Sequence, residues 1–406
     1  MISKLLNTMV RINNKIPGKL VDYLYLAAFA LVLIYDYDFL TRFDRGPFRL
    51  VYIAGAALAA IVLLIRFLNI KNENMISLAF AAVLLLIGIS YILARGSYYF
   101  FVLTLLIVGA MRVEEKKILT VYLLVATLFF GAMLTHFFVT YPDWKELRSI
   151  HFGSINTTDC QGMILFLLVT FLFYREEHIG FTEIIVCGGI VLWFWSYTHA
   201  EINMYCSLVC LVLAGVMKAG SALELKIGIK PRQALGYLVS FSFLICAVVM
   251  IFLTARFDAD NEKWRALNEI LHQRLESSHR IYTLYPPCAW GSEYVQNGWG
   301  YQPGASYWDL YPEYGYSFID SSYPHILINH GYLVFAMIVG VMTFVSFRYA
   351  KKGDLYKVLL LAVIAVDCAA EGHLKELSCN VWLILPFARY AATPCELFPG
   401  NRAFLR

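Results

Sequence analysis

The stretch Leu235–Thr254 reads LGYLVSFSFLICAVVMIFLT and contains no charged side chain. A hydrocarbon core about 30 Å thick is crossed by about 20 apolar residues in helical form. In lipid the backbone polar groups must bond within their own segment, so a stretch of this kind crosses as a helix. The run therefore predicts a transmembrane helix, and it decides the class of the chain.

Similar runs recur throughout the 406 residues, which are 60% hydrophobic and 15% charged, with mean hydropathy +0.62. This composition lies far from that of soluble domains. We expect twelve spans, near 20–40, 48–66, 75–94, 97–111, 118–141, 158–174, 182–199, 201–217, 235–254, 324–348, 355–371 and 377–391. The sequence thus predicts an all-α polytopic integral membrane protein with about twelve transmembrane helices, as one membrane domain over 1–406.

The distribution of Lys and Arg orients these spans. With the N-terminus in the cytoplasm, 21 of the 33 Lys and Arg residues fall in cytoplasmic connections, as the positive-inside rule requires. Both termini are then cytoplasmic, and we expect no cleavable signal peptide. The net charge of +4 reflects this topology and gives no reason to expect nucleic-acid binding.

The segment 255–323 is then a large extracytoplasmic loop, far longer than an ordinary connection. Long ordered connections usually carry function. Apolar residues recur at three- and four-residue steps over 261–285, which predicts a helix within the loop, with Asp260 as its N-cap. The loop contains five basic residues: Arg256, Lys263, Arg265, Arg274 and Arg280.

Arg274 is expected on the apolar side of this helix, three and four residues after Leu271 and Ile270. A cation in that place needs an anion or a polar cavity, or else it extends toward the lipid headgroups. Arg280 follows Glu276 by four residues, which suits a simple intrahelical ion pair. Arg274 and Arg280 are therefore candidates for a site, with structural alternatives beside them.

Carboxylates and imidazoles form one stripe of the expected helix, at Glu269, His272, Glu276 and His279. Such spacing holds divalent metals in some helical bundles. One helix cannot supply every ligand of a closed site, and polar stripes are usually solvated faces. We expect no metal there.

The second half of the loop, 282–323, is crowded with Tyr and Trp, and Gly and Pro are interleaved among them. Flat aromatic faces suit the C–H surfaces of sugars, although such a loop can also pack on its own aromatics. Glycan contact is the favoured interpretation, with Trp290, Tyr294, Trp299 and Tyr323 as substrate-binding candidates.

The cytoplasmic connections are short and contain no phosphate-binding glycine loop, so nucleotide chemistry is not expected on that side. Chemistry is expected at the outer face, where energy must arrive in an activated lipid or an ion gradient. Most cysteines lie inside the spans as small apolar residues. A disulfide between Cys288 and Cys379 is conceivable, but no spacing pattern supports it.

Several motifs of the chain resemble Wzy-type polysaccharide polymerases, within the O-antigen ligase and polymerase superfamily. The motifs are LNEIL at Leu267–Leu271, Arg274–Leu275, Gly291, DSSY at Asp320–Tyr323, and Gly331. Arg280 and Gly291 also fit an Arg-x10-Gly pattern that some members show.

Two further segments strengthen the resemblance. RSIHFGSIN at Arg148–Asn156 is similar to an earlier outer loop of the family, and Glu371 with Asn380 resembles the acid and Asn before its last span. One position departs from the family: after the seventh span it often shows Ser-Arg, where this chain has His199-Ala-Glu201. No role is carried over to that position.

The resemblance implies a GT-C-like membrane glycosyltransferase without a cofactor, in the bacterial cytoplasmic membrane. It would polymerise oligosaccharide repeat units into O-antigen, capsule or exopolysaccharide at the outer face. The growing glycan would move from undecaprenyl pyrophosphate to the next lipid-linked unit. The implied partners are the undecaprenyl-pyrophosphate-linked oligosaccharide and membrane lipid, together with flippase and chain-length regulator proteins.

This chemistry assigns expected roles to the candidate residues. Guanidinium groups match the oxygens of a departing pyrophosphate, which favours Arg274, Arg280 and Arg148. A base must take the proton of the acceptor hydroxyl, and His279, Asp320 and Glu371 are the candidates, in no order that the sequence establishes. The resemblance adds Asn156 to the substrate-binding residues.

Three alternatives stay open. An O-antigen-ligase-like enzyme would use the same donor and hand the glycan to a different acceptor. A multispan transporter suits twelve spans, but it predicts two matching halves with interrupted helices and gives 255–323 no task. A scaffold without catalysis would explain the aromatics but not the arginines of the loop.

Overall fold

The computed structural model describes residues 17–37, 45–68, 75–143, 152, 154, 157–223, 228–294, 296, 301–302, 305–306 and 317–390. Most of them lie in helices. Within these ranges the only strands are the short antiparallel pair β1 (Tyr301–Gln302) and β2 (Ala305–Ser306). Nine helices of the described chain are long and apolar enough to cross a membrane, so the prediction of an all-α polytopic membrane protein is confirmed.

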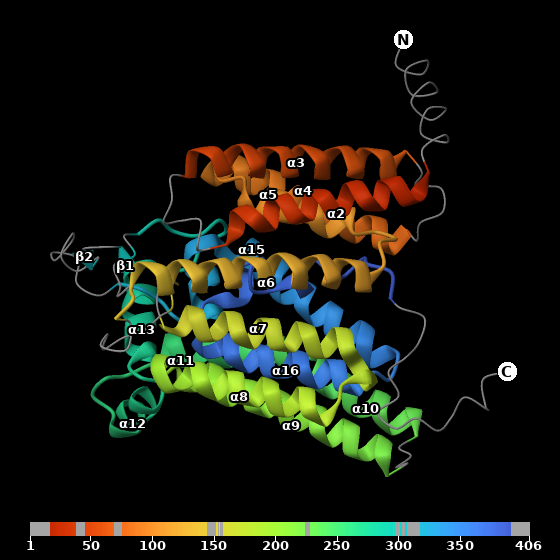
Figure 1. Ribbon diagram of the computed structural model, residues 1–406. Helices are drawn as coiled ribbons and strands as arrows, with labels where there is room; N and C mark the ends of the chain where they lie inside the picture. Colours follow the sequence, from red (N-terminus) through yellow and green to blue (C-terminus); the bar gives the residue numbers. More distant parts are fainter. Residues whose placement is uncertain are drawn as a thin grey trace. The chain divides into compact units, whose positions relative to one another are not determined.

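The long apolar helices follow the predicted spans closely (Figure 1). They are α2 (Gly18–Asp36), α3 (Arg45–Phe67), α4 (Met75–Arg95), α6 (Glu115–Thr140), α7 (Thr157–Arg175), α8 (Phe181–Thr198), α9 (Glu201–Ala222), α10 (Ile229–Ser240) with α11 (Ser242–Arg256), and α15 (Ser322–Lys351). A single non-helical residue, Phe241, separates α10 from α11. The stretch Leu235–Thr254, predicted as one transmembrane helix, therefore forms two consecutive helices.

Three of the predicted spans do not form long apolar helices in the structure. The fourth is α5 (Tyr99–Gly109), with 11 residues, and the eleventh is α16 (Leu355–Ala370), with 16. The twelfth, 377–391, is not an α-helix: it contains only the 3-10 turn η7 (Val381–Ile384). Pro386 lacks the N–H that a helix would need there, and residues 377–386 are all buried.

The chain divides into two compact units. The first contains α2 to α5, the start of α6 and residues 381–391. Within it α5 packs on α2, α3 and α4. Tyr25 donates a hydrogen bond from its hydroxyl to the carbonyl of Leu106, at 3.0 Å, and backbone hydrogen bonds join Arg389 to Val113 and Glu115.

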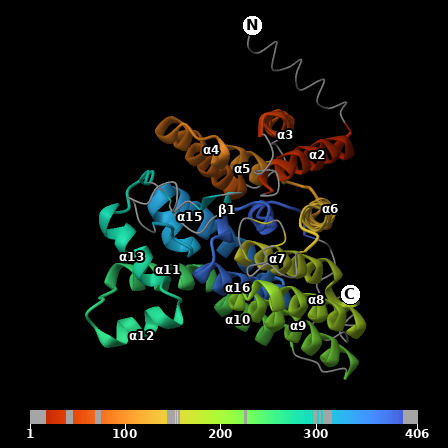
Figure 2. The same cartoon turned by 60° about the vertical axis from the view of Figure 1, so that its left-hand side comes forward.

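The second unit, from Thr127 to Asn380 among the described residues, is built around α16. This helix packs against α7, α9, α10, α11 and α15, and the two views of Figures 1 and 2 show it surrounded by them. One face of α16 carries a buried charge network in which Lys357 contacts Glu176 at 2.8 Å and Asp354 at 3.8 Å. Pairing of this kind is what a buried cation requires.

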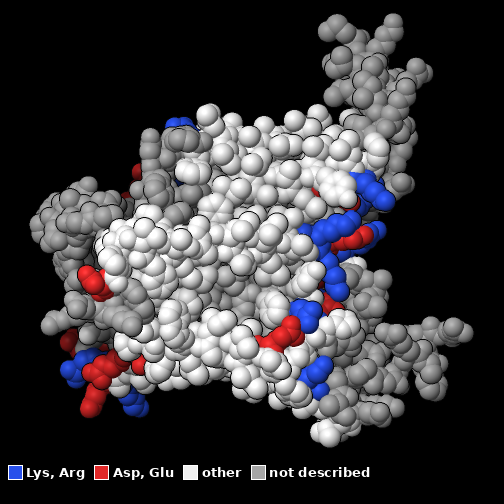
Figure 3. All heavy atoms as spheres, viewed as in Figure 1, with Lys and Arg blue, Asp and Glu red and all other residues white. Residues whose placement is uncertain are grey.

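Charged side chains of α7 and α8 gather at the helix ends, and uncharged ones cover the surface between (Figure 3). Asp159 and Arg175 mark the ends of α7, and Glu183 marks the start of α8. This is the pattern of helices that cross a hydrocarbon layer.

At a kink in α15, backbone hydrogen bonds join that helix to the 255–323 segment. Gly331 has φ +83° and ψ 175°, which interrupts the helix. The freed backbone groups are satisfied by the loop, because Ser292 donates its N–H to the carbonyl of Ile328 at 2.8 Å and Tyr332 donates to the carbonyl of Cys288 at 3.0 Å. A Cβ on Gly331 would collide with the backbone of Ala289 and of Gly291.

We predict that Gly331→Ala destabilises the protein. The backbone conformation is one that glycine alone adopts readily, which costs about 1–3 kcal/mol for other residues, and the collision with the loop adds to it. Gly340→Ala is the matched control on the same helix, because its Cβ would meet nothing within 4 Å and should change stability by less than about 1 kcal/mol. Thermal unfolding in detergent measures both, and equal unfolding temperatures for the two variants would contradict this account.

Candidate functional site

The helix predicted over 261–285 is broken in two, α12 (Glu262–Ile270) and α13 (Arg274–Leu284). Between them His272 and Gln273 adopt positive φ values of 51° and 64°. The side chain of Asn268 stabilises the break, since its Oδ1 accepts from the N–H of Glu276 at 3.0 Å and its Nδ2 donates to the Glu276 carboxylate at 3.2 Å. The N-cap of α12 is Asn261, not Asp260 as predicted.

The break places Arg274 at the first position of α13, where it meets two carboxylates. Its Nη2 lies 2.7 Å from Oε1 of Glu371, and its Nε lies 3.8 Å from Oδ2 of Asp320. The Nη1 atom is buried and has no hydrogen-bond partner among the described residues. Of the two alternatives for Arg274, the structure shows an ion pair and not an extension toward headgroups. The helical face predicted from Leu271 and Ile270 was wrong, because the helix ends at Ile270, which is exposed. We call Arg274, Asp320 and Glu371 the arginine cluster.

Glu371 directly follows α16, and α15 holds its backbone. Ser322, the first residue of α15, donates both its N–H, at 3.1 Å, and its hydroxyl, at 2.5 Å, to the carbonyl of Glu371. Burial raises the pKa of the Glu371 carboxyl, and the nearby Arg274 guanidinium offsets part of that rise. The cluster thus joins α13, α15 and α16 at one end of the second unit.

The other candidates on α13 lie outside the arginine cluster. Six residues along a helix turn the side chain by about 240°, and Arg280 is exposed, with no ion pair to Glu276 or to any other described residue. His279 is half-buried, and its Nδ1 lies 2.7 Å from the backbone carbonyl of Thr254. That contact attaches α13 to α11 through Nδ1 of the ring.

The aromatic candidates are placed differently from one another. Tyr323 is fully buried and donates its hydroxyl to the carbonyl of Ala365 at 2.9 Å, so it fastens α15 to α16. Tyr294 stacks on Tyr285 with ring centroids 5.3 Å apart, and Trp290 is half-buried. Three candidates lie outside the described residues: Arg148, Asn156 and Trp299.

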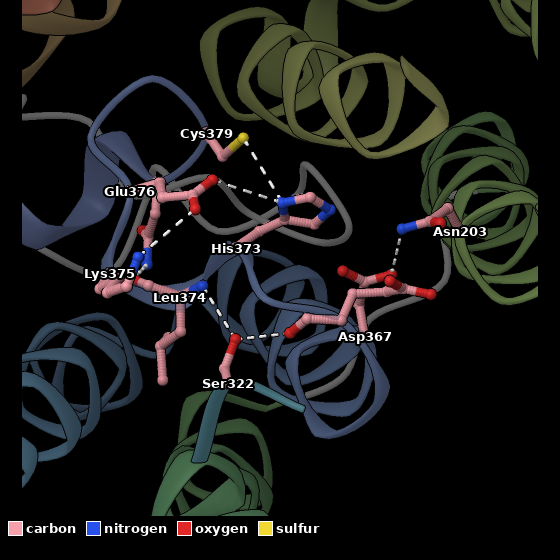
Figure 4. Close-up of polar contacts among 10 residues, drawn as sticks. Asn203, Ser322, Asp367, His373, Leu374, Lys375, Glu376 and Cys379 are labelled. Carbon is pink, nitrogen blue, oxygen red and sulfur yellow. Dashed lines mark hydrogen bonds and ion pairs between the residues drawn. The ribbon is translucent and has the colours of Figure 1, made fainter. Parts of the chain in front are cut away.

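A second polar group follows Glu371 along the chain (Figure 4). His373, Glu376 and Cys379 place their ligand-type atoms within 4.8 Å of one another. No other group of three or more such residues in the described chain comes that close, so the stripe Glu269, His272, Glu276 and His279 forms none. Cys288 and Cys379 form no disulfide, so the conceivable bridge is absent.

One turn before Glu371, on α16, the buried Asp367 accepts a hydrogen bond from Asn203 of α9 at 2.9 Å. No local pattern singles out Asn203, because its partner lies 164 positions away. Asn268 and Ser322 were also missed as site residues. A polar side chain within a helical pattern could have indicated a buried contact for each of them, but nothing in the sequence specifies their partners.

Comparison with known proteins gives no relative: no protein-family model matches the chain, and neither a curated protein nor a solved structure matches it. The proposed function therefore rests on the contacts of the residues described above and on the resemblance of the sequence motifs.

We predict that Arg274→Gln lowers the free energy of unfolding by about 3–5 kcal/mol, because it leaves the buried Glu371 carboxylate without its cation. Arg280→Gln is the matched control on the same helix and should lie within about 0.5 kcal/mol of wild type. The double variant Arg274→Gln/Glu371→Gln should recover most of the loss. Thermal unfolding in detergent tests this, and an additive double variant would show that the two residues are not coupled.

Proposed function

We propose that this protein is a membrane glycosyltransferase of the Wzy polymerase type, with a GT-C-like fold, in the bacterial cytoplasmic membrane. It would extend a polysaccharide at the outer face, moving the growing glycan from undecaprenyl pyrophosphate to the next lipid-linked repeat unit. The observation that carries the proposal is the arginine cluster, which the long loop and the membrane helices form together.

The cluster provides both groups that the transfer needs. Breaking the bond between the anomeric carbon and the pyrophosphate oxygen leaves the electron pair, and a growing negative charge, on that oxygen. The Nη1 of Arg274, which has no hydrogen-bond partner among the described residues, is a guanidinium donor for this charge. A fixed donor in a partly dehydrated place stabilises a developing charge more than one in water does.

Glu371 is the best of the three candidate bases. The acceptor hydroxyl attacks the anomeric carbon and must lose its proton as the new C–O bond forms. Glu371 has a raised pKa through burial, which increases its affinity for that proton. Asp320 is more exposed, with 29% of its side chain accessible against 5% for Glu371. We assign Asp320 the role of orienting Arg274 and the acceptor.

A transporter is the second candidate, and one observation favours it. Asp367 is a buried acid inside an apolar helix, and its Oδ2 has no partner among the described residues. Ionisable groups in that position often mark an ion pathway. The transporter ranks second because it gives neither α12, α13 nor the arginine cluster a task.

The decisive experiment incubates the purified full chain with the lipid-linked repeat unit of the source cell. A ladder of repeat multiples supports the polymerase, and one glycan added to a foreign acceptor supports the ligase. Uptake into sealed vesicles without new glycosidic bonds supports the transporter. The last two results each overturn the proposal.

We predict that Arg274→Lys slows ladder formation at least about 100-fold, because a lone ammonium replaces an oriented guanidinium donor. Glu371→Gln should slow it by about 100-fold or more, because the amide cannot accept the proton. Arg265→Gln and Glu262→Gln, two exposed positions on α12, should leave the rate unchanged. Equal ladders from all four variants at equal protein levels would remove the arginine cluster from the mechanism.

A further inference from the structure

The segment between α16 and η7 contains an arrangement that the proposed transfer does not use. It reads HLKELSC from His373 to Cys379 and begins with the 3-10 turn η6 (His373–Lys375). The imidazole, carboxylate and thiol recur every three residues, and the turns bring them to one side (Figure 4). Neither Arg274 nor Asp320 is among these three residues.

One nitrogen of His373 faces both other groups. Its Nδ1 lies 3.6 Å from Oε2 of Glu376 and 3.9 Å from Sγ of Cys379. A single N–H can point at only one of these two groups. A cation between the three atoms would satisfy all of them at once.

The geometry fits a small tetrahedral ion. Zinc bonds of about 2.0–2.1 Å to nitrogen and oxygen and about 2.3 Å to sulfur place neighbouring ligand atoms about 3.4–3.6 Å apart. The observed 3.6 and 3.9 Å exceed these values by only a few tenths of an ångström. A thiolate with an imidazole selects zinc-like ions over magnesium or calcium.

The backbone of the segment is fixed before any ion binds. Asn380 donates its N–H to the carbonyl of Glu376 at 2.7 Å and its side-chain Nδ2 to the carbonyl of Leu374 at 2.8 Å. Leu374 in turn donates to the Ser322 hydroxyl at 3.1 Å. Fixed ligands of this kind bind metal without a large cost in ordering.

The surroundings of the imidazole agree with a metal ligand. The ring packs edge-on against Phe166, with centroids 5.7 Å apart, and lies against Gly162, where a Cβ would collide with it. Its Nε2 points away from Cys379 and Glu376 in Figure 4. Nε2 is buried without a partner among the described residues, as is Oδ2 of Asp367. An ordered water is the usual partner of such atoms, and it would accept the Nε2 proton of a ligating histidine.

The same contacts argue against a cysteine nucleophile. In a catalytic Cys–His–acid arrangement the acid orients one ring nitrogen while the other activates the thiol. Here acid and thiol share Nδ1. Lys375 contacts Oε1 of Glu376 at 3.5 Å and leaves Oε2 for the ion.

We propose that His373 Nδ1, Glu376 Oε2 and Cys379 Sγ bind one zinc-like divalent transition-metal ion, with a fourth position for water. The ion fastens the irregular segment that begins at Glu371. This assignment does not depend on the glycosyltransferase proposal.

The experiment uses the purified full chain in detergent, stripped with a chelator and titrated with Co²⁺ as a spectroscopic substitute for zinc. We expect saturation at one Co²⁺ per chain, with a thiolate-to-cobalt charge-transfer absorption that added Zn²⁺ removes. Cys379→Ser should lose the absorption. Cys288→Ser, which removes an exposed free thiol, should leave both the absorption and the stoichiometry unchanged.

Glu376→Gln keeps the thiol and tests the site even where Cys379→Ser does not fold. It should weaken Co²⁺ binding at least about tenfold. The proposal is overturned if the wild type shows no saturable thiolate band, if Cys288→Ser abolishes the band, or if Glu376→Gln binds Co²⁺ as tightly as the wild type.

Discussion

A charged group inside an apolar helical bundle must have a partner, and this requirement organises the second unit of the protein. Arg274, Lys357 and Asp367 are each matched by a polar group from a distant part of the chain. The pair of Arg274 and Glu371 matters most, because it attaches the 255–323 segment to the end of α16, next to the start of α15. Removing one partner costs more than the pair contributes, since the remaining charge stays buried.

The same requirement governs the irregular backbone of the protein. Where α15 is kinked at Gly331, the loop residues Cys288 to Ser292 provide the missing hydrogen bonds. Where the chain leaves α16, Ser322 and Asn380 bind backbone groups of 371–376. Non-helical segments survive in such a bundle because buried side chains and neighbouring backbone replace the bonds of a helix. These segments are also where the candidate site and the proposed metal ligands lie.

Several features of the fold and the candidate site could be predicted from the sequence. Hydrophobic runs identified the nine long apolar helices of the described chain, and ion pairing was one of the alternatives predicted for Arg274. Glu371, Asp320, Gly291 and Gly331 belong to the motifs on which the resemblance rests. The break between α12 and α13 was missed because it depends on the side chain of Asn268, which accepts the N–H of Glu276 in the first turn of α13, whereas the hydrophobic period continues across the break.

Local sequence determined the class of protein, since burying about 20 apolar residues in lipid depends only on their composition and helical hydrogen bonding. Tertiary structure alone decided which charges meet, because Arg274 and Glu371 are 97 positions apart and Asn203 and Asp367 are 164 apart. It also decided that 377–391 is no transmembrane helix, although its apolar content predicted one. A run of apolar residues reports that a segment is buried, and only its neighbours determine whether lipid or protein buries it.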